Sequence, residues 1–148
     1  MKKILISLLM LTISIVGFAN LPEKNPSNDE PKGIEFFNGS WDEALALAKA
    51  ENKPIFLDIS TAWCGYCKRM KAKTYTDTNV GAHYNNNFIN VSVDAEKGEG
   101  IELKKKYGVT GYPSFVFLNS DGSLATKTSG YRSAEDFLKL ANSISFNK

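Results

Sequence analysis

The chain has 148 residues, 43% hydrophobic and 11% aromatic, with two cysteines and a formal net charge of +2. This composition supports one domain with its own hydrophobic core, and it excludes a disordered chain or a small scaffold held by several disulfides. The low net charge argues against a nucleic-acid partner, because such partners are bound through strongly basic surfaces.

The first 19 residues have the layout of a secretory signal peptide. Lys2 and Lys3 precede an apolar stretch that ends in small residues near Ala19. The stretch is shorter than the roughly 20 residues that span a bilayer; an uncleaved membrane anchor is the rival interpretation. We predict a signal peptide at 1–19, a periplasmic or secreted location, and membrane contact only through the signal or such an anchor. Lys2 and Lys3 account for the whole net charge, so the mature chain is close to neutral.

Residues 20–33 are rich in proline, asparagine and charged side chains and have no periodic apolar pattern, so we predict a flexible leader. A single folded domain is expected at 34–148. Strand signals lie at 34–37, 55–59, 88–93, 115–118 and 124–128, and a hairpin turn is expected at 120–123. Helix signals run from a Ser40–Glu43 capping box to Asn52, from Cys64 toward Tyr75, and over 77–85, 101–107 and the stretch capped by Ser133. The run Asn85–Asn87 is interpreted as a loop. This order implies an α/β fold, a mixed sheet with helices on both faces.

The chemistry is concentrated at Cys64 and Cys67, which stand three positions apart where a helix is expected to begin. The spacing brings both sulfurs to one helical turn, so they can close a reversible disulfide. The unpaired N–H groups and dipole at a helix start lower the pKa of Cys64 below the free-thiol value of about 8.5. Cys64 is therefore the predicted nucleophile and Cys67 the resolving cysteine. We assign the adjacent Trp63, Gly65 and Tyr66 to substrate binding.

Other uses of the two cysteines fit the sequence less well. A structural disulfide that closes so small a loop stabilises a fold poorly. A zinc site needs about four ligands, and His83, expected on an ordinary helix or loop surface, is the only other soft candidate. Haem attachment needs a histidine directly after the second cysteine, where Lys68 stands. We therefore expect no metal and no cofactor.

Asp58 interrupts an apolar strand six positions before Cys64. A buried carboxylate is costly unless it has a partner or a task. Beside a dithiol, it is suited to take the proton of Cys67 as the second thiol attacks, and burial raises its pKa toward a useful range. The simpler alternative is a hydrogen bond to a neighbouring loop; we predict the catalytic role.

Tyr112 and Pro113 stand directly before a buried strand, the one place where a central strand tolerates proline. The sequence pattern alone favours a trans Tyr112–Pro113 peptide bond over a cis bond. A cis bond would turn the Tyr112 backbone outward, where it can pair with an extended substrate.

Asp58, the stretch Trp63-Cys64-Gly65-Tyr66-Cys67-Lys68 and Gly111-Tyr112-Pro113 together resemble the thioredoxin superfamily, over roughly residues 34–146. The resemblance implies the thioredoxin fold, a nucleophilic Cys64, a resolving Cys67, a buried acid at Asp58 and a cis Pro113. The chain is most similar to secreted thioredoxin-like proteins and to the soluble thioredoxin domain of bacterial transmembrane disulfide-interchange reductases. Asn52-Lys53-Pro54 and Thr74-Tyr75-Thr76-Asp77 carry this closer likeness.

Three departures from the family pattern bear on function. Gly65-Tyr66 replaces the Gly-Pro of cytosolic thioredoxins, which leaves the direction of electron flow open. Asn90 stands where thioredoxin has a lysine near the buried acid, so the pKa of Asp58 is set differently. The basic residues after Cys67 are read as a solvated helix face, with thiolate support or an acidic partner surface as the alternative; they are Lys68, Arg69, Lys71 and Lys73.

We predict an exported, monomeric thiol–disulfide oxidoreductase that reduces protein disulfides through a Cys64/Cys67 dithiol cycle. Because its compartment is oxidising, a reductase there needs a membrane electron donor. The alternatives are a disulfide oxidase or isomerase and, from another class, a non-catalytic binding or chaperone-like module.

Overall fold

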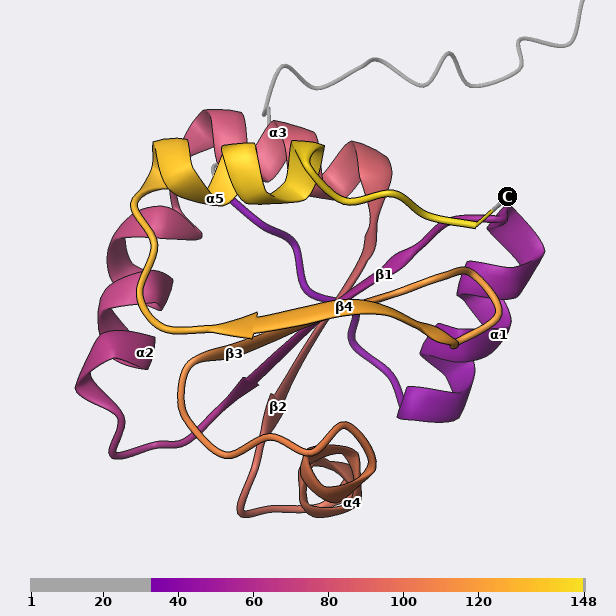
Figure 1. The fold of residues 1–148 in the computed structure, drawn as a ribbon, viewed down its shortest axis with the longest axis horizontal. Coiled ribbons are helices and arrows are strands. Elements are labelled where there is room, and N and C mark those ends of the chain that lie inside the picture. Colours follow the sequence, from indigo (N-terminus) through magenta and orange to yellow (C-terminus); the bar gives the residue numbers. More distant parts are fainter. Residues whose placement is uncertain (1–32, 148) are drawn as a thin grey trace, which may run out of the picture.

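The structure, a computed structural model, describes residues 33–147. A four-stranded sheet lies between two groups of helices, with the strands in the order β2-β1-β3-β4 (Figure 1). The strands are β1 (Ile55–Ser60), β2 (Ile89–Asp94), β3 (Ser114–Leu118) and β4 (Leu124–Ser129). β1 runs parallel to β2 and antiparallel to β3, and β3 and β4 form an antiparallel hairpin. This is the predicted mixed sheet.

The helices are α1 (Trp41–Glu51), α2 (Gly65–Arg69), α3 (Thr78–Asn87), α4 (Glu99–Lys106) and α5 (Ala134–Asn142). A π-helical turn, η1 (Met70–Thr74), continues α2. Helix starts follow the predicted caps: Ser40 and Glu43 form a capping box, and Ser133 caps α5. Asn52, in the left-handed conformation with φ of 49°, ends α1.

Two hydrophobic cores fill the two faces of the sheet. Ile55, Leu57 and Ile59 of β1 pack with α1 and α4 in one core. Phe56 of the same strand packs in the other core, among aromatic side chains from β3, α3 and α5 and the ring of Tyr75, which follows η1. Because side chains alternate along a strand, Asp58 belongs to the aromatic face with Phe56. The helices on both faces confirm the predicted layers.

Two local predictions were wrong. Residues 34–37 form no strand, although the N–H of Phe37 donates to the carbonyl of Asn90 in β2 at 2.7 Å. The segment leaves the sheet edge because the N–H of Ile34 donates instead to the carbonyl of Tyr75. Asn85–Asn87 is the last turn of α3 and not a loop. The Asn85 side chain tethers the incoming chain there, accepting from the N–H of Glu35 at 2.9 Å and donating to the carbonyl of Gly33 at 3.1 Å.

The predicted signal peptide and nearly all of the predicted leader lie outside the described residues. Between residues 33 and 147, no helix is long and apolar enough to cross a membrane.

Candidate redox site

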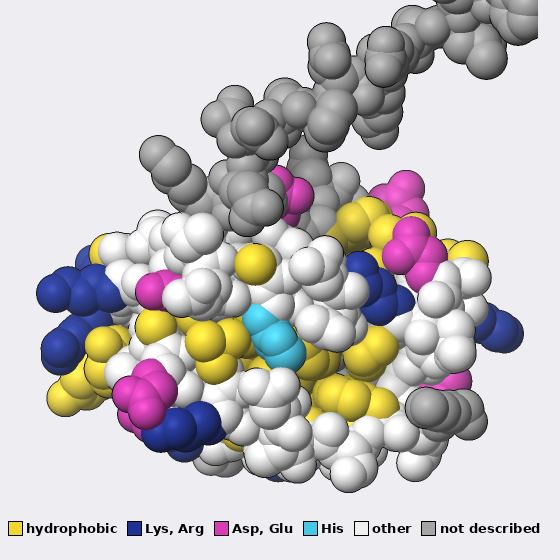
Figure 2. All heavy atoms as spheres, turned by 90° about the horizontal axis from the view of Figure 1, so that it is seen from above, with side chains coloured by type: hydrophobic (Ala, Val, Ile, Leu, Met, Phe, Trp, Pro, Cys, Tyr) yellow, Lys and Arg dark blue, Asp and Glu magenta, His cyan; other side chains and the backbone are white. Residues whose placement is uncertain are grey.

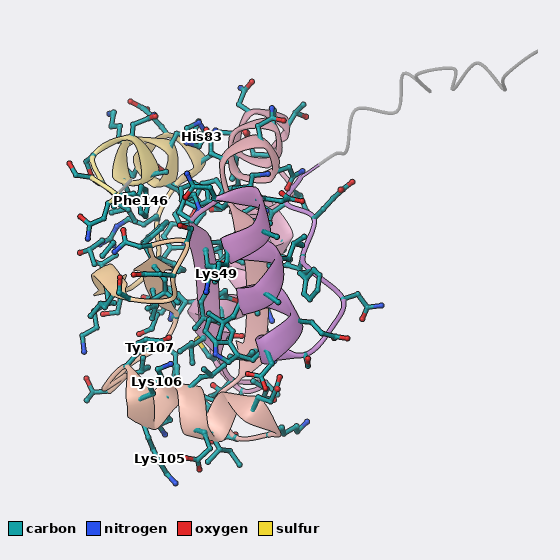
Figure 3. The ribbon with its side chains drawn as sticks, turned by 90° about the vertical axis from the view of Figure 1, so that its right-hand side faces the viewer. Lys49, His83, Lys105, Lys106, Tyr107 and Phe146 are labelled. Atoms are coloured by element: carbon teal, nitrogen blue, oxygen red, sulfur yellow. A yellow bond between two sulfur atoms is a disulfide. The ribbon has the colours of Figure 1, made fainter. Side chains whose placement is uncertain are left out.

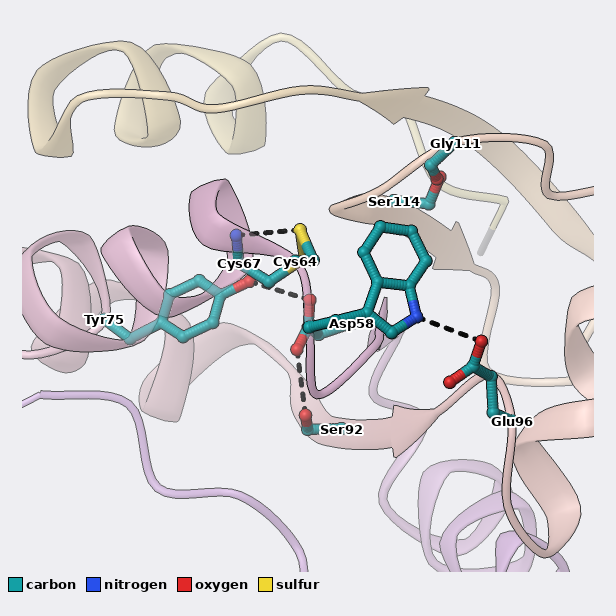
Figure 4. The surroundings of a disulfide bond; sticks show 9 residues. Asp58, Cys64, Cys67, Tyr75, Ser92, Glu96, Gly111 and Ser114 are labelled. Carbon is teal, nitrogen blue, oxygen red and sulfur yellow. Dashed lines mark hydrogen bonds between the residues drawn. A yellow bond between two sulfur atoms is a disulfide. The ribbon is translucent and has the colours of Figure 1, made fainter.

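Cys64 and Cys67 form a disulfide at the point where the chain leaves β1 and enters α2 (Figure 4). Their Cα atoms are 5.3 Å apart. Both side chains are buried, with 5% of Cys64 and 2% of Cys67 exposed. The predicted pairing is present, and Cys67 is the more shielded partner by a small margin.

Cys64 is the N-cap residue of α2. Its sulfur accepts a hydrogen bond from the backbone N–H of Cys67 at 3.0 Å. A helix start presents backbone N–H groups that lack partners within the helix. The local geometry therefore directs a hydrogen-bond donor at the Cys64 sulfur, an arrangement that stabilises a thiolate once the disulfide is reduced.

Asp58 is 1% exposed and lies directly below Cys64 and Cys67 in the view of Figure 4. Its carboxylate accepts a hydrogen bond from the Tyr75 hydroxyl at 3.0 Å and from the Ser92 hydroxyl at 2.8 Å. Burial raises the pKa of Asp58, and the Ser92 and Tyr75 hydrogen bonds and the Lys71 charge oppose this rise. Burial, together with the Asp58 charge, holds the pKa of Tyr75 well above its ordinary value.

Sequence reasoning missed both hydroxyl partners of Asp58. Ser92 lies opposite Asp58 in the parallel register of β1 and β2, and this pairing was the signal that could have found it. Asn90, expected near the acid, pairs with Phe56 instead. Its amide donates to the carbonyl of Glu35 and to the side chain of Asn85, both at 3.2 Å. The expectation that the pKa of Asp58 is set differently from that in thioredoxin therefore involves Ser92 and Tyr75, and Asn90 makes no hydrogen bond to the acid.

The π turn places Tyr75 at the acid. The N–H of Tyr75 donates to the carbonyl of Met70, five residues earlier, at 2.9 Å. The wider turn brings Tyr75 into the aromatic core, where it is 4% exposed and packs 5.7 Å from the ring of Phe137. π turns are rare and occur often at functional sites.

Aromatic side chains border the disulfide. Trp63 is 66% exposed, and its indole N–H donates to Glu96 at 3.0 Å. The ring of Trp63 packs edge-on against Tyr112, with centroids 5.8 Å apart. Tyr66 is 62% exposed and lies 6.4 Å from the ring of Tyr131. A Cβ at Gly65 would meet nothing within 4 Å, so the backbone between the cysteines is open.

The loop before β3 carries the Tyr112–Pro113 peptide bond, which is cis as the family resemblance implies. Pro113 is buried and Tyr112 is partly exposed. The hydroxyl of Ser114 donates to the carbonyl of Gly111 at 2.7 Å and ties the loop to the start of β3.

A pocket of about 650 Å³ lies away from this site, at the opposite end of β1. Its wall includes Pro54, which precedes β1, and Phe88, together with His83 and Phe146, which are labelled in Figure 3. His83 is partly buried beside the rings of Tyr84 and Phe88, and this burial lowers its pKa. No cluster of three or more metal-ligating side chains occurs in the described part of the chain.

A thioredoxin fold with a disulfide between two cysteines at the start of α2 defines a thiol–disulfide oxidoreductase of the thioredoxin type. The sequence model of the family described as thioredoxin-like domain matches residues 41–145, and the chain belongs to this family.

Similar proteins include the thiol:disulfide interchange protein DsbD of Yersinia pestis, 33% identical over 96 residues, 63% of this chain and 16% of that protein. A Bacteroides thetaiotaomicron protein proposed to be a disulphide-isomerase is 42% identical, covers 75% of this chain and 92% of its own, and superposes with a TM-score of 0.68. The C-terminal domain of Neisseria meningitidis DsbD in its oxidised form is 28% identical, covers 74% and 97%, and has a TM-score of 0.59. The chain spans about a sixth of the length of the Yersinia relative.

Proposed function

We propose that the protein is an exported thiol–disulfide oxidoreductase that reduces disulfides in other proteins. The observation that carries this proposal is the buried Asp58 carboxylate, drawn next to the disulfide in Figure 4, together with a first cysteine that caps a helix. A structural disulfide needs neither feature, whereas a dithiol cycle uses both. The similarity to DsbD proteins, named for thiol:disulfide interchange, supports the same class of reaction.

The cycle begins from the reduced dithiol. The Cys64 thiolate attacks one sulfur of the substrate disulfide, whose S–S bond breaks and releases the first substrate sulfur as a thiolate that takes up a proton. The mixed disulfide joins Cys64 to the substrate. Cys67 then loses its proton and attacks the Cys64 sulfur, which releases the second substrate thiolate. The two electrons of the dithiol reduce the substrate, and the Cys64–Cys67 disulfide is formed.

Asp58 is the proposed acceptor of the Cys67 proton, directly or through water. Tyr75 and Ser92 suit this role because each hydroxyl donates to the ionised carboxylate and can accept from its protonated form. The substrate chain is proposed to lie over Gly65 and between the exposed rings of Trp63 and Tyr66. The backbone of Tyr112 beside Pro113 is proposed to offer it hydrogen bonds, in the manner of strand addition.

The proposed location is the periplasm or the outside of the cell, because the chain begins with the features of a signal peptide. Such a compartment is oxidising, so the Cys64–Cys67 disulfide must be reduced again by a membrane electron donor. We propose a monomer that meets its disulfide-containing protein partners one at a time.

The reduction potential, measured by equilibration with glutathione, tests the direction of electron flow. A reductase is expected near −270 mV, the value typical of thioredoxin, and an oxidase near −120 mV. Exchange of Cys67 for alanine should also trap substrates in cells as mixed disulfides on Cys64. If Cys64→Ser keeps full function in cells, the protein acts as a binding module and the redox proposal fails.

A disulfide isomerase is the second candidate, favoured by the 42% identity to the Bacteroides thetaiotaomicron protein. An intermediate potential of about −180 mV, together with reshuffling of a scrambled substrate without net reduction, would favour this candidate.

A further inference from the structure

The helix that follows the disulfide is covered by cations and by no anions. No Asp or Glu occurs between Asp58 and Asp77. The four basic side chains of this stretch are all exposed: Lys68, Arg69, Lys71 and Lys73. The ion pairs of the described residues lie elsewhere, at Asp94–Lys97, Glu102–Lys105 and Glu135–Lys139. Lys and Arg side chains gather at the left edge of Figure 2, the side on which α2 lies in Figure 1.

The charged side chains of α2 and η1 are all positive, unlike those of the other charged helices. α1, α4 and α5 each carry acidic residues in the first turn and lysine in the last, a mixture that weakens the field around them. α2 and η1 have no acidic residue in either first turn. Because the charges of the chain beyond the signal segment nearly balance, the four cations beside the disulfide reflect segregation of charge and not a basic protein. The carboxylate of Glu96, which accepts from the Trp63 indole, is an acidic side chain at the Trp63 side of this region.

Exposed aromatic rings lie at the same place. Trp63 and Tyr66, which flank Cys64 in the sequence, are the two most exposed large hydrophobic side chains of the described residues. The guanidinium of Arg69 lies 4.4 Å from the centre of the Tyr131 ring, and that ring neighbours Tyr66. Exposed aromatic and arginine side chains are typical of surfaces that bind partners.

We propose that this surface, formed by Trp63, Tyr66, Lys68, Arg69 and Lys71, selects acidic protein segments in which Asp or Glu flanks the reacting cysteine. The inference rests on the proposed function and names its substrate class. The partner is a protein because the proposed reaction is the reduction of protein disulfides, and the Cys64–Cys67 pair lies in the chain between Trp63 and Lys68 of this surface. The aromatic rings take up the apolar part of the segment, and the cations attract its carboxylates and speed the encounter.

Three synthetic peptide disulfides with one core sequence test the proposal, with the positions around the cysteine filled by Glu, Gln or Lys. The full chain is reduced, freed of reductant and mixed with each peptide in single turnovers. At low salt the Glu peptide should react about tenfold or more faster than the Lys peptide, and about 0.5 M salt should remove most of this preference.

The charge-reversed variant Lys68→Glu/Lys71→Glu should invert the order of the Glu and Lys peptides. The ratio of the two rates is the readout, because any change in the intrinsic reactivity of the dithiol affects both peptides and is reported by the Gln peptide. Lys49→Glu/Lys106→Glu is the control with the same change in net charge. Both lysines are labelled in Figure 3, which views the molecule from the side opposite α2. The control should keep the wild-type order.

Each outcome decides a separate claim. Equal rates for the Glu and Lys peptides at low salt, or an unchanged order in Lys68→Glu/Lys71→Glu, would overturn the acidic-segment proposal while reduction of the Gln peptide upholds the proposed function. If none of the three peptides is reduced, the proposed function fails and the substrate class falls with it.

Discussion

The hydroxyl of Tyr75 is predicted to set the pH at which the resolving step works. Tyr75→Phe removes the donor that lies 3.0 Å from the Asp58 carboxylate and keeps the ring that packs in the aromatic core. The carboxylate, at 1% exposure, has no bulk water to replace the lost donor. The ionised form of Asp58 is therefore penalised in the variant, and its pKa rises further above its ordinary value.

The size of the effect follows from the charge on the acceptor. A hydrogen bond to a charged group contributes about 1.5–3 kcal/mol, and about 1.4 kcal/mol corresponds to a factor of ten. Loss of the Tyr75 hydroxyl should therefore shift the ratio of ionised to neutral Asp58 about ten- to a hundredfold toward the neutral form. The Ser92 hydrogen bond, at 2.8 Å on the other oxygen, remains.

The assay follows release of the second substrate thiol from the mixed disulfide as a function of pH, across the range in which the protonation of Asp58 is expected to limit the rate. In Tyr75→Phe the rate should fall about ten- to a hundredfold at the acidic end and approach the wild-type rate at the alkaline end. Ser92→Ala should move the profile in the same direction.

Tyr84→Phe is the matched control. Tyr84 belongs to the same aromatic core, and its hydroxyl donates to the carbonyl of Phe137 at 3.2 Å and not to Asp58. The control should lose a little stability and keep the wild-type pH profile. The reasoning is refuted if Tyr75→Phe, correctly folded, releases product with the wild-type pH dependence.

Three further predictions concern stability and reactivity. Because burial raises the pKa of Asp58, the folded state holds the Asp58 proton more tightly than the unfolded state. As pH rises from the ordinary pKa of 3.8 through the folded pKa, the wild type should therefore lose stability relative to Asp58→Asn, by up to about 1.4 kcal/mol per pH unit. Urea denaturation measures this difference, and stability curves that stay parallel over the pH range would contradict it. Gly81→Ala should cost about 1–3 kcal/mol of unfolding free energy, because its Cβ would lie 2.6 Å from the Cα of Gly33, whereas Gly111→Ala, with open space around the Cβ, should cost little. In the reduced protein, iodoacetamide near pH 6 should label Cys64 faster than Cys67, and equal slow labelling would rule out a stabilised Cys64 thiolate.

The elements that sequence could predict are those encoded by local pattern. The capping residues, the apolar run of β1 and the hairpin turn before β4 depend on neighbours within a few positions, and each appears in the structure as expected. The prediction of a strand at 34–37 was wrong because the conformation of this segment depends on an acceptor far away in the sequence. The N–H of Ile34 donates to the carbonyl of Tyr75 and not to a neighbouring strand.

The same distinction explains what was missed at the site. The grouping of Asp58, Cys64 and Cys67 could be predicted because all three lie within ten residues of one another in the sequence. Ser92 lies 34 positions from Asp58 and meets it only through strand register, and Tyr75 reaches it only because a π turn alters the helix. Neither long-range pairing nor a π turn leaves a periodic signal in one sequence.

Three separate features around the disulfide depart from what is usual in a stable fold. The buried Asp58 carboxylate has only hydroxyl donors, η1 departs from regular α-helix, and large aromatic side chains are exposed at Trp63 and Tyr66. Features that break local rules without an evident gain in stability are expected at functional sites. These features lie close to the Cys64–Cys67 bond, either in the neighbouring sequence or across the pairing of β1 with β2. Their concentration there points to a site selected for reaction, because a disulfide that only held the fold would be better served by an apolar residue at position 58.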